Sequence, residues 1–244
     1  MRRRGSRLRT GNGVEKITNK WSMNENSGTT LFDSIGGINM SYPFDLAASS
    51  VAGQVGNAVK FDLQSRNAQT AVAPSLSWIQ NIGGLNKAIP FTLVFWSNES
   101  GSSFNPVMSI GSGGFYHLYI RKASNIFDVL LQYKVNGVTN TLFYELGAFP
   151  SGKKLITLVF DPYQINSANQ LTYYANGIFS SAGNSSILPT DGSLGLESHY
   201  FTAGGYGYTG SRTSIFTGWQ DEIRFAMGSI LTPSEILNTY NLEK

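Results

Sequence analysis

Short apolar runs separated by glycine, asparagine, serine and proline recur along most of this chain. They occupy residues 58–62, 69–73, 91–97, 106–110, 115–121, 127–134, 140–145, 154–161, 170–180, 193–197 and 215–225. Many short strands with turn signals between them are typical of an antiparallel sandwich. The runs at 91–96 and 155–160 are apolar on both faces, which indicates central strands covered from each side. A length of 244 residues suits one large all-β domain, so the pattern predicts a single two-sheet antiparallel sandwich.

One turn between these runs has a specific signature. Asn176 and Gly177 stand between the apolar segments 171–175 and 178–180. Asn-Gly favours a type I′ turn, because both of its central residues need a positive φ. The sequence therefore predicts a β-hairpin over residues 171–180.

The last strand, at 216–225, carries an acidic residue between apolar neighbours. Because side chains alternate along a strand, one face is expected to hold Trp219, Asp221, Ile223 and Phe225 and the other Gln220, Glu222 and Arg224. A carboxylate in such surroundings either accepts hydrogen bonds from backbone N–H groups of a neighbouring loop or binds calcium. The structural role is the preferred interpretation for Asp221.

A capped helix is predicted after this strand. Thr232 is a natural N-cap, Pro233 suits the first helical position, and Glu235 completes a capping box. The apolar stripe of the helix is expected to consist of Ile236, Leu237 and Tyr240. The chain is therefore expected to end in a short amphipathic helix.

Six segments, in their order and spacing, resemble the laminin-G-like, concanavalin A-like jelly-roll domains. They are Trp21 to Asp33, Gly56 to Asp62, Phe91 to Ser97, Lys154 to Asp161, Leu171 to Gly177, and the closing stretch from Phe216 to Tyr240. One departure is that Gly152, Lys153 and Lys154 stand where the family often has Trp-His before a strand. The resemblance implies a two-sheet antiparallel jelly-roll sandwich over residues 21–244, closed by a short C-terminal helix.

Positive charge is concentrated in the first 20 residues. The chain has a net charge of +3; residues 1–20 hold seven basic residues and one acidic residue, or +6, which leaves −3 for residues 21–244. The basic residues are Arg2, Arg3, Arg4, Arg7, Arg9, Lys16 and Lys20. No apolar run follows the arginines or approaches the length of a membrane span, so neither a signal peptide nor a transmembrane segment is predicted. Residues 1–20 form either a solvated, disordered tail or a basic arm that docks on an acidic protein surface or on nucleic acid, and docking is the expected role.

The acidic residues are poorly spaced for glycoside hydrolysis, an activity that the family resemblance brings into consideration. The reaction needs two facing carboxylates about 5 to 9.5 Å apart, and enzymatic relatives place them two or four positions apart on one strand. No two acidic residues of this chain have that spacing, and the adjacent Asp221 and Glu222 face opposite sides. The chain has no cysteine, and its two histidines are isolated in the sequence. No catalytic function is predicted.

Two regions have residues suited to ligand binding. The Gly- and Tyr-rich segment 199–210 carries tyrosines that could stack on sugar faces or on a protein partner, or could simply cover the sheet. In the run at 115–121, alternation places Phe115, His117, Tyr119 and Arg121 opposite Tyr116, Leu118 and Ile120. The predicted ligand-binding residues are Tyr200, Tyr206, Tyr208, His117 and Tyr119. No cofactor is predicted; if calcium binds, as it does at the rim of relatives, Asp161 and Asn166 are its expected ligands.

These features favour a non-catalytic structural or adhesive module of a larger assembly. The basic arm and the low charged fraction of 14% point to a phage or virus particle, with the arginines as the docking residues and capsid proteins as partners. The alternative is a carbohydrate-binding, lectin-like module of an extracellular or cell-surface protein, which the resemblance and the tyrosines support. A glycoside hydrolase is the least favoured interpretation.

Overall fold

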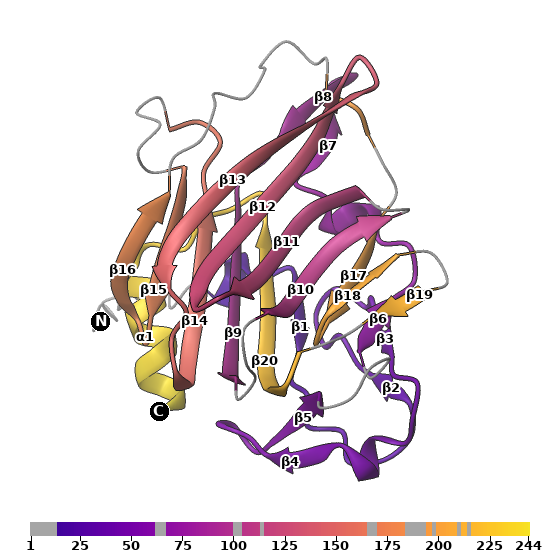
Figure 1. Cartoon of the computed structure of the whole chain (residues 1–244), viewed down its shortest axis with the longest axis vertical. Coiled ribbons are helices and arrows are strands. Elements are labelled where there is room, and N and C mark those ends of the chain that lie inside the picture. Colours follow the sequence, from indigo (N-terminus) through magenta and orange to yellow (C-terminus); the bar gives the residue numbers. More distant parts are fainter. Residues whose placement is uncertain are drawn as a thin grey trace, which may run out of the picture.

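The computed structural model describes residues 14–61, 67–99, 104–112, 115–164, 170–183, 194–196, 199–208, 211–213 and 216–244. Two eight-stranded antiparallel sheets form its body, and in Figure 1 the strands β10 to β13 cross over β9, β14 and β20. Sheet A has the order β16-β15-β14-β9-β20-β5-β4, with β1 also paired to β20, and sheet B has the order β13-β12-β11-β10-β17-β6-β3-β2. The predicted all-β, two-sheet antiparallel sandwich is confirmed.

The strands range from two to eleven residues. Sheet A contains β1 (Asn19–Trp21), β4 (Ser50–Ala52), β5 (Asn57–Phe61), β9 (Phe91–Glu99), β14 (Gly152–Phe160), β15 (Leu171–Ala175), β16 (Ile178–Gly183) and β20 (Gly218–Met227). Sheet B contains β2 (Thr30–Leu31), β3 (Met40–Ser41), β6 (Ala68–Thr70), β10 (Phe104–Ser112), β11 (Phe115–Ala123), β12 (Ile126–Val135), β13 (Val138–Ala148) and β17 (Tyr200–Ala203). Two further hairpins pair β7 (Ile79–Ile82) with β8 (Leu85–Ala88) and β18 (Tyr206–Tyr208) with β19 (Ser211–Thr213).

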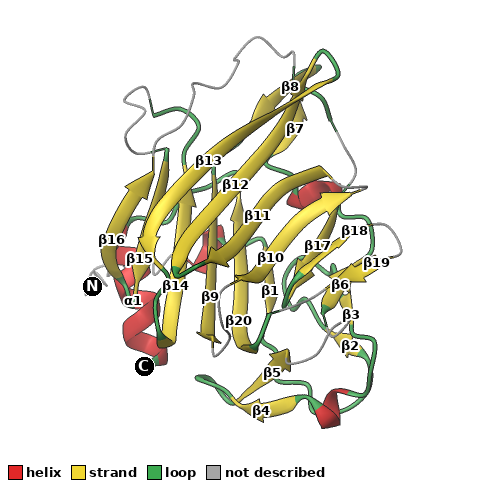
Figure 2. Cartoon of the chain, in the orientation of Figure 1, coloured by secondary structure: helices red, strands yellow, loops and turns green. Residues whose placement is uncertain are grey.

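Helical structure is sparse beside this amount of strand (Figure 2). Among the residues that the structure describes, it consists of α1 (Pro233–Glu243) and the single 3₁₀ turns η1 (Val14–Lys16), η2 (Leu46–Ala48) and η3 (Pro74–Leu76). Within the described residues, no helix is long and apolar enough to cross a membrane.

The main core lies between the two sheets. Trp21 on β1 is fully buried, and its ring centroid is 5.3 Å from that of Phe201 on sheet B and 6.4 Å from that of Phe225 on sheet A. Its indole N–H donates to the carbonyl of Ile38 at 2.8 Å, which satisfies the polar atom of this side chain. The short strand β1 is therefore tied into the sandwich by an aromatic cluster that spans both sheets.

A second, smaller apolar cluster joins sheet A to helix α1. Its buried members are Val94, Trp96, Leu155, Val159, Leu231 and Ile236. Tyr240 packs against it, with its ring centroid 5.9 Å from that of Trp96. Leu237 is instead 42% exposed, so its predicted place in the buried stripe is wrong. Residues four apart on a helix share a face, and here Ile236 and Tyr240 take the face toward the sheet.

The predicted capping box of α1 is confirmed. The Thr232 hydroxyl accepts the backbone N–H of Glu235 at 3.3 Å, and the Glu235 carboxylate accepts the backbone N–H of Thr232 at 2.7 Å. We expect Thr232→Ala to lower the free energy of unfolding by about 1 kcal/mol, because one N–H at the helix start loses its acceptor. Chemical denaturation measures this, with the exposed Asn238→Ala in the same helix as control. Equal losses in both variants would contradict the role of the cap.

The predicted hairpin at 171–180 is also confirmed. Asn176 and Gly177 have φ values of 52° and 78°, as a type I′ turn requires. A Cβ atom at Gly177 would lie 3.0 Å from the Cα of Leu237. The glycine therefore serves the turn and also lets α1 lie against it.

The sandwich begins before residue 21. Thr18 donates its backbone N–H to Phe225 at 2.7 Å, and β1 pairs with β20 from Asn19 onward, so the predicted boundary at residue 20 falls inside a strand. Lys16 forms an ion pair with Glu235 at 2.8 Å. The described part of the expected arm, from residue 14, thus packs on the domain. The docking residues Arg2, Arg3, Arg4, Arg7 and Arg9 lie outside the described residues.

Candidate ligand-binding face

A β-bulge in β11 determines which aromatic residues sheet B turns outward. Gly111 of β10 stands opposite Tyr116, and Ile110 stands opposite Leu118, so His117 is the extra residue. Tyr116 and Tyr119, three positions apart, consequently share the outer face, where their rings stack with centroids 4.9 Å apart. Tyr119 is only 7% exposed, so the half-buried Tyr116 is the ring of this pair that a ligand could reach. The strict alternation expected for 115–121 is therefore wrong, and Tyr116 joins Tyr119 in place of His117.

His117 lies in the interior. It and His199 are both fully buried, with ring centroids 3.5 Å apart. Burial lowers the pKa of His117 well below its usual value, and the nearby His199 and Lys134 lower it further. A neutral, buried imidazole cannot reach a surface ligand, so His117 leaves the set of predicted binding residues.

Tyr200 is brought to the same outer face as the two stacked tyrosines. Its strand neighbours Phe201 and Ala203 point into the main core, so Tyr200 points outward. Tyr200 and Tyr116 each stand opposite Gly111, on either side of β10. A Cβ atom at Gly111 would lie 3.2 Å from Cδ1 of Tyr116, so the absence of a side chain makes room for this ring.

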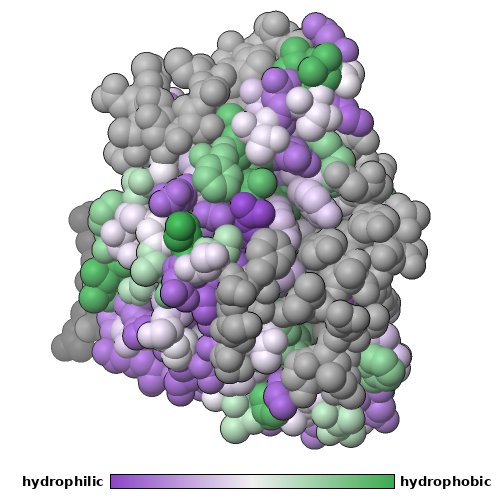
Figure 3. Space-filling model, in the orientation of Figure 1, coloured by the Kyte–Doolittle hydropathy of each residue, from purple (hydrophilic) through white to green (hydrophobic). Residues whose placement is uncertain are grey.

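The strand register extends this face across β12 and β13. Directly opposite residues of antiparallel strands point to the same side with Cβ atoms about 4.5 to 5.5 Å apart. The resulting cross-strand rows are Tyr200, Gly111 and Tyr116, then Tyr119, Leu130 and Phe143, then Arg121, Asp128 and Glu145. We call these residues the tyrosine face. Figure 3, which views the sheet B side, shows hydrophobic and hydrophilic residues next to one another over β11 to β13.

Polar groups hold the tyrosine face in place. The Gln132 side chain on β12 accepts the backbone N–H of Tyr116 at 2.7 Å. Arg121 donates to Asp128 at 3.2 Å, and its guanidinium carbon lies 5.9 Å from the centre of the Tyr119 ring. The backbone of Tyr116 and the side chain next to Tyr119 are therefore held in position before any ligand binds.

The charged row brings together two carboxylates that lie on different strands. Asp128 and Glu145 stand opposite one another on β12 and β13. Asp128 is 3% exposed, and burial raises its pKa; Arg121 opposes this rise and Glu145 adds to it. Glu145 is exposed. The two acids are seventeen positions apart in the sequence, so only the register of the hairpin reveals that they are neighbours.

The remaining predicted binding residues are only partly described. Tyr206 and Tyr208 belong to β18, which lies beside β10 and β17, but their side chains are outside the described part. Asp161 accepts the backbone N–H of Tyr163 at 3.1 Å and the side-chain amide of Gln164 at 3.0 Å, as a turn-stabilising residue does. Asn166 lies outside the described residues, and among those described no group of three His, Cys, Asp or Glu could hold a metal ion.

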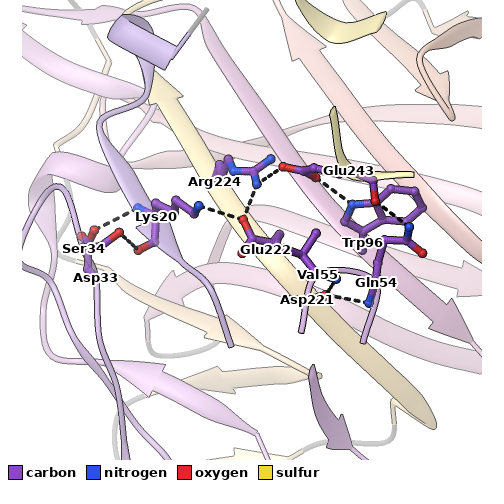
Figure 4. Close-up of polar contacts among 10 residues, drawn as sticks. All are labelled: Lys20, Asp33, Ser34, Gln54, Val55, Trp96, Asp221, Glu222, Arg224 and Glu243. Carbon is purple, nitrogen blue, oxygen red and sulfur yellow. Dashed lines mark hydrogen bonds and ion pairs between the residues drawn. The ribbon is translucent and has the colours of Figure 1, made fainter. Parts of the chain in front are cut away.

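Asp221 has the structural role that its sequence context favours. Its Oδ2 accepts the backbone N–H groups of Gln54 and Val55, each at 2.8 Å (Figure 4). Burial raises the pKa of Asp221 to about 6, although these two hydrogen bonds oppose the rise. The carboxylate therefore fixes the loop before β5 to the last strand.

A second bulge lies beside Asp221 on β20. The register against β9 shifts between Asp221 and Arg224, and Glu222 has a φ of 51°. Before the bulge Gln220 points inward, where its side chain donates to the carbonyl of Val107 at 2.9 Å; after the bulge Ile223 lies in the core. The predicted alternation, which placed Asp221 and Ile223 on one face, is therefore wrong.

Ion pairs cover the outer side of this bulge. Glu222 accepts hydrogen bonds from Lys20, at 2.9 Å, and from Arg224. Arg224 also pairs with Glu243 at the end of α1 (Figure 4). These buried and half-buried charges neutralise one another, so this network attaches β1 and α1 to β20.

Comparison with known proteins identifies the fold. No protein family model matches this chain, and no curated protein matches it. A Trypanosoma rangeli sialidase in complex with 2,3-difluoro-KDN resembles it with a TM-score of 0.59 and 15% identity, over 93% of this chain and 32% of the sialidase chain. The receptor-binding domain of botulinum neurotoxin D resembles it with a TM-score of 0.60 and 12% identity, over 93% of this chain and 52% of that chain. This chain thus spans a third to a half of those chains, and it has a concanavalin A-like, lectin-like β-sandwich fold.

Proposed function

We propose that this domain is a carbohydrate-binding, lectin-like module whose ligand lies on the tyrosine face. The observation that carries the proposal is the convergence of Tyr116 and Tyr200 on the outer face of sheet B, where the buried Tyr119 ring stacks against Tyr116. Tyrosine offers a large apolar ring and a hydroxyl at low entropic cost, which suits the C–H faces and hydroxyl groups of a sugar.

The polar residues of the face complement these rings. A ligand site needs a few positioned polar groups beside its apolar surface, and Arg121, Glu145 and Gln132 lie in or next to the aromatic rows. Support also comes from the fold, because the similar chains include a sialidase solved with 2,3-difluorosialic acid and a toxin's receptor-binding domain.

We propose further that the module binds without cleaving. Hydrolysis needs two carboxylates that both face the scissile bond, whereas Asp128 is almost fully buried against Arg121 and Glu145 alone of this pair is exposed. Incubation with polysaccharides followed by a reducing-end assay is expected to show no release. Release that disappears in Glu145→Gln would overturn this part of the proposal.

Glycan binding provides the direct test. We expect the full chain to bind a subset of glycans on an array, and Tyr116→Ala and Tyr200→Ala each to weaken binding about tenfold, since one ring stacked on a ligand is worth roughly 1 kcal/mol beyond its buried area. Titration calorimetry with the best glycan measures the change.

Phe179→Ala is the matched control, because this exposed aromatic residue lies on sheet A. Its affinity should equal that of the wild type. An array without any bound glycan, with and without calcium, would contradict the proposal, as would undiminished binding by the Tyr116→Ala/Tyr200→Ala double variant.

A further inference from the structure

A pocket on the opposite sheet has a different chemistry from the tyrosine face. It has a volume of about 220 Å³ and is lined by Gln54, Trp96, Lys153, Asn176, Tyr240 and Lys244. These residues come from the loop before β5, strands β9 and β14, the turn after β15 and the end of α1. The pocket is thus formed where five distant segments meet on the helix side of sheet A.

Two aromatic rings form one wall of this pocket. Trp96 and Tyr240 have ring centroids 5.9 Å apart. The indole N–H of Trp96 donates to Glu243 at 2.8 Å, which fixes the orientation of the ring (Figure 4). Trp96 is only 2% exposed and Tyr240 is half-buried, so Tyr240 provides the surface on which a ligand ring would pack.

Two amide side chains add neutral hydrogen-bonding groups. Gln54 donates its Nε2 to the backbone carbonyl of Glu243 at 2.6 Å, and its Oε1 is buried without a hydrogen-bond partner in the described part of the chain. Asn176 uses its Oδ1 to accept the backbone N–H of Leu155 at 3.0 Å, so its NH₂ group is the part left to donate. Between them these side chains offer an acceptor and a donor of the kind that hydroxyl groups require.

Two ammonium groups give the pocket its charge. Lys153 forms no ion pair with any described residue, and the Lys244 ammonium lies 5.5 Å from the centre of the Tyr240 ring. The neighbouring carboxylate of Glu243 is already occupied by Arg224 and by the Trp96 indole. Neither lysine forms an ion pair with another described residue, so the two ammonium groups would attract an anion.

We propose that this pocket binds an acidic monosaccharide, that is, a sugar ring that carries a carboxylate. Its volume is below the roughly 300 to 1,000 Å³ of sites for drug-sized ligands, as expected for a ligand of about one ring. The lysines bind the carboxylate, the Tyr240 ring packs on the sugar face, and the amides of Gln54 and Asn176 bind hydroxyl groups. The site lies on the other sheet from the tyrosine face and does not depend on it.

Titration of the full chain with glucuronate, glucose and acetate, followed by NMR or calorimetry, tests the proposal. We expect glucuronate to bind about tenfold or more tightly than either of the others, because glucose lacks the charge and acetate lacks the ring. Lys153→Gln should weaken glucuronate binding about tenfold, since it removes a charge-assisted hydrogen bond. Lys87→Gln on β8, outside the pocket, is the control and should bind as the wild type does.

Each other outcome overturns the inference. Equal binding of glucose removes the role of the lysines, equal binding of acetate removes the role of the ring and amides, and absence of glucuronate binding removes the site. The Tyr116→Ala/Tyr200→Ala double variant separates this inference from the proposed function. It should still bind glucuronate in the pocket, and loss of glucuronate binding in that variant would assign the ligand to the tyrosine face instead.

Discussion

Gly204→Ala is expected to lower the free energy of unfolding by about 3 kcal/mol. Gly204 has a φ of 74°, a left-handed conformation that costs other residues roughly 1 to 2 kcal/mol. A Cβ atom there would overlap the ring of Phe61. Phe61 is fully buried between Tyr42 and Phe216, so its ring cannot move aside, and overpacking of this kind costs roughly 1 to 3 kcal/mol. Urea or guanidinium unfolding measures the loss.

Gly83→Ala separates the cost of the left-handed conformation from the cost of overpacking. Gly83 also has a positive φ, of 62°, but a Cβ atom there would meet nothing within 4 Å. This control should lose only about 1 kcal/mol, the conformational part of the effect. If both variants lose the same amount, the contact between residue 204 and Phe61 does not constrain the junction of β17 and β18.

Asp221→Ala is expected to destabilise the domain by about 3 kcal/mol. The substitution removes the acceptor of two backbone N–H groups, and each buried donor left unsatisfied costs roughly 1 to 3 kcal/mol. Asp221→Asn is the matched control at pH 7, because its carbonyl oxygen has the same size and can accept both N–H groups. An equal loss in the asparagine variant would show that the charge of Asp221, not its acceptor oxygen, holds the loop.

The wild type and Asp221→Asn are expected to differ in how their free energies of unfolding depend on pH. The pKa of Asp221 is raised from 3.8 to about 6 in the folded chain, first of all by burial, so the folded state binds the proton more tightly than the unfolded state. The stabilisation from this proton is fully present below about pH 4 and is lost as the pH rises through 6. Unfolding free energies at pH 4, 5, 6 and 7 should therefore show the wild type losing stability relative to Asp221→Asn. A constant difference over this range would contradict the raised pKa.

Several features of the fold could be predicted because local physical chemistry determines them. The Asn176-Gly177 turn follows from the φ values it needs, and the capping box of α1 follows from N–H groups that a helix start always leaves open. The role of Asp221 as a backbone acceptor follows from the cost of burying a carboxylate without partners. Each of these depends on a few adjacent residues or on one rule of burial.

The bulges were missed because one inserted residue reverses the inside-outside alternation without changing the local composition. For β20, a positive φ at Glu222 has no signal in the sequence. For β11, Gly111 of the partner strand belongs to a Gly-Ser-Gly-Gly stretch that follows the apolar run at 106–110, so it indicates a turn and not a bulge inside a strand. The sequence therefore has no specific signal that places Tyr116 on the outer face.

The class of fold follows from the amino-acid sequence alone, because periodicity, turns and caps are local patterns within a short window of the chain. The two candidate sites, in contrast, exist only in the folded chain. The tyrosine face depends on the register of five neighbouring strands, and the pocket depends on Gln54, Trp96, Lys153 and Tyr240 meeting across nearly two hundred positions. Strand register and the position of the helix are determined by the packing of the whole core, so no local sequence pattern predicts them.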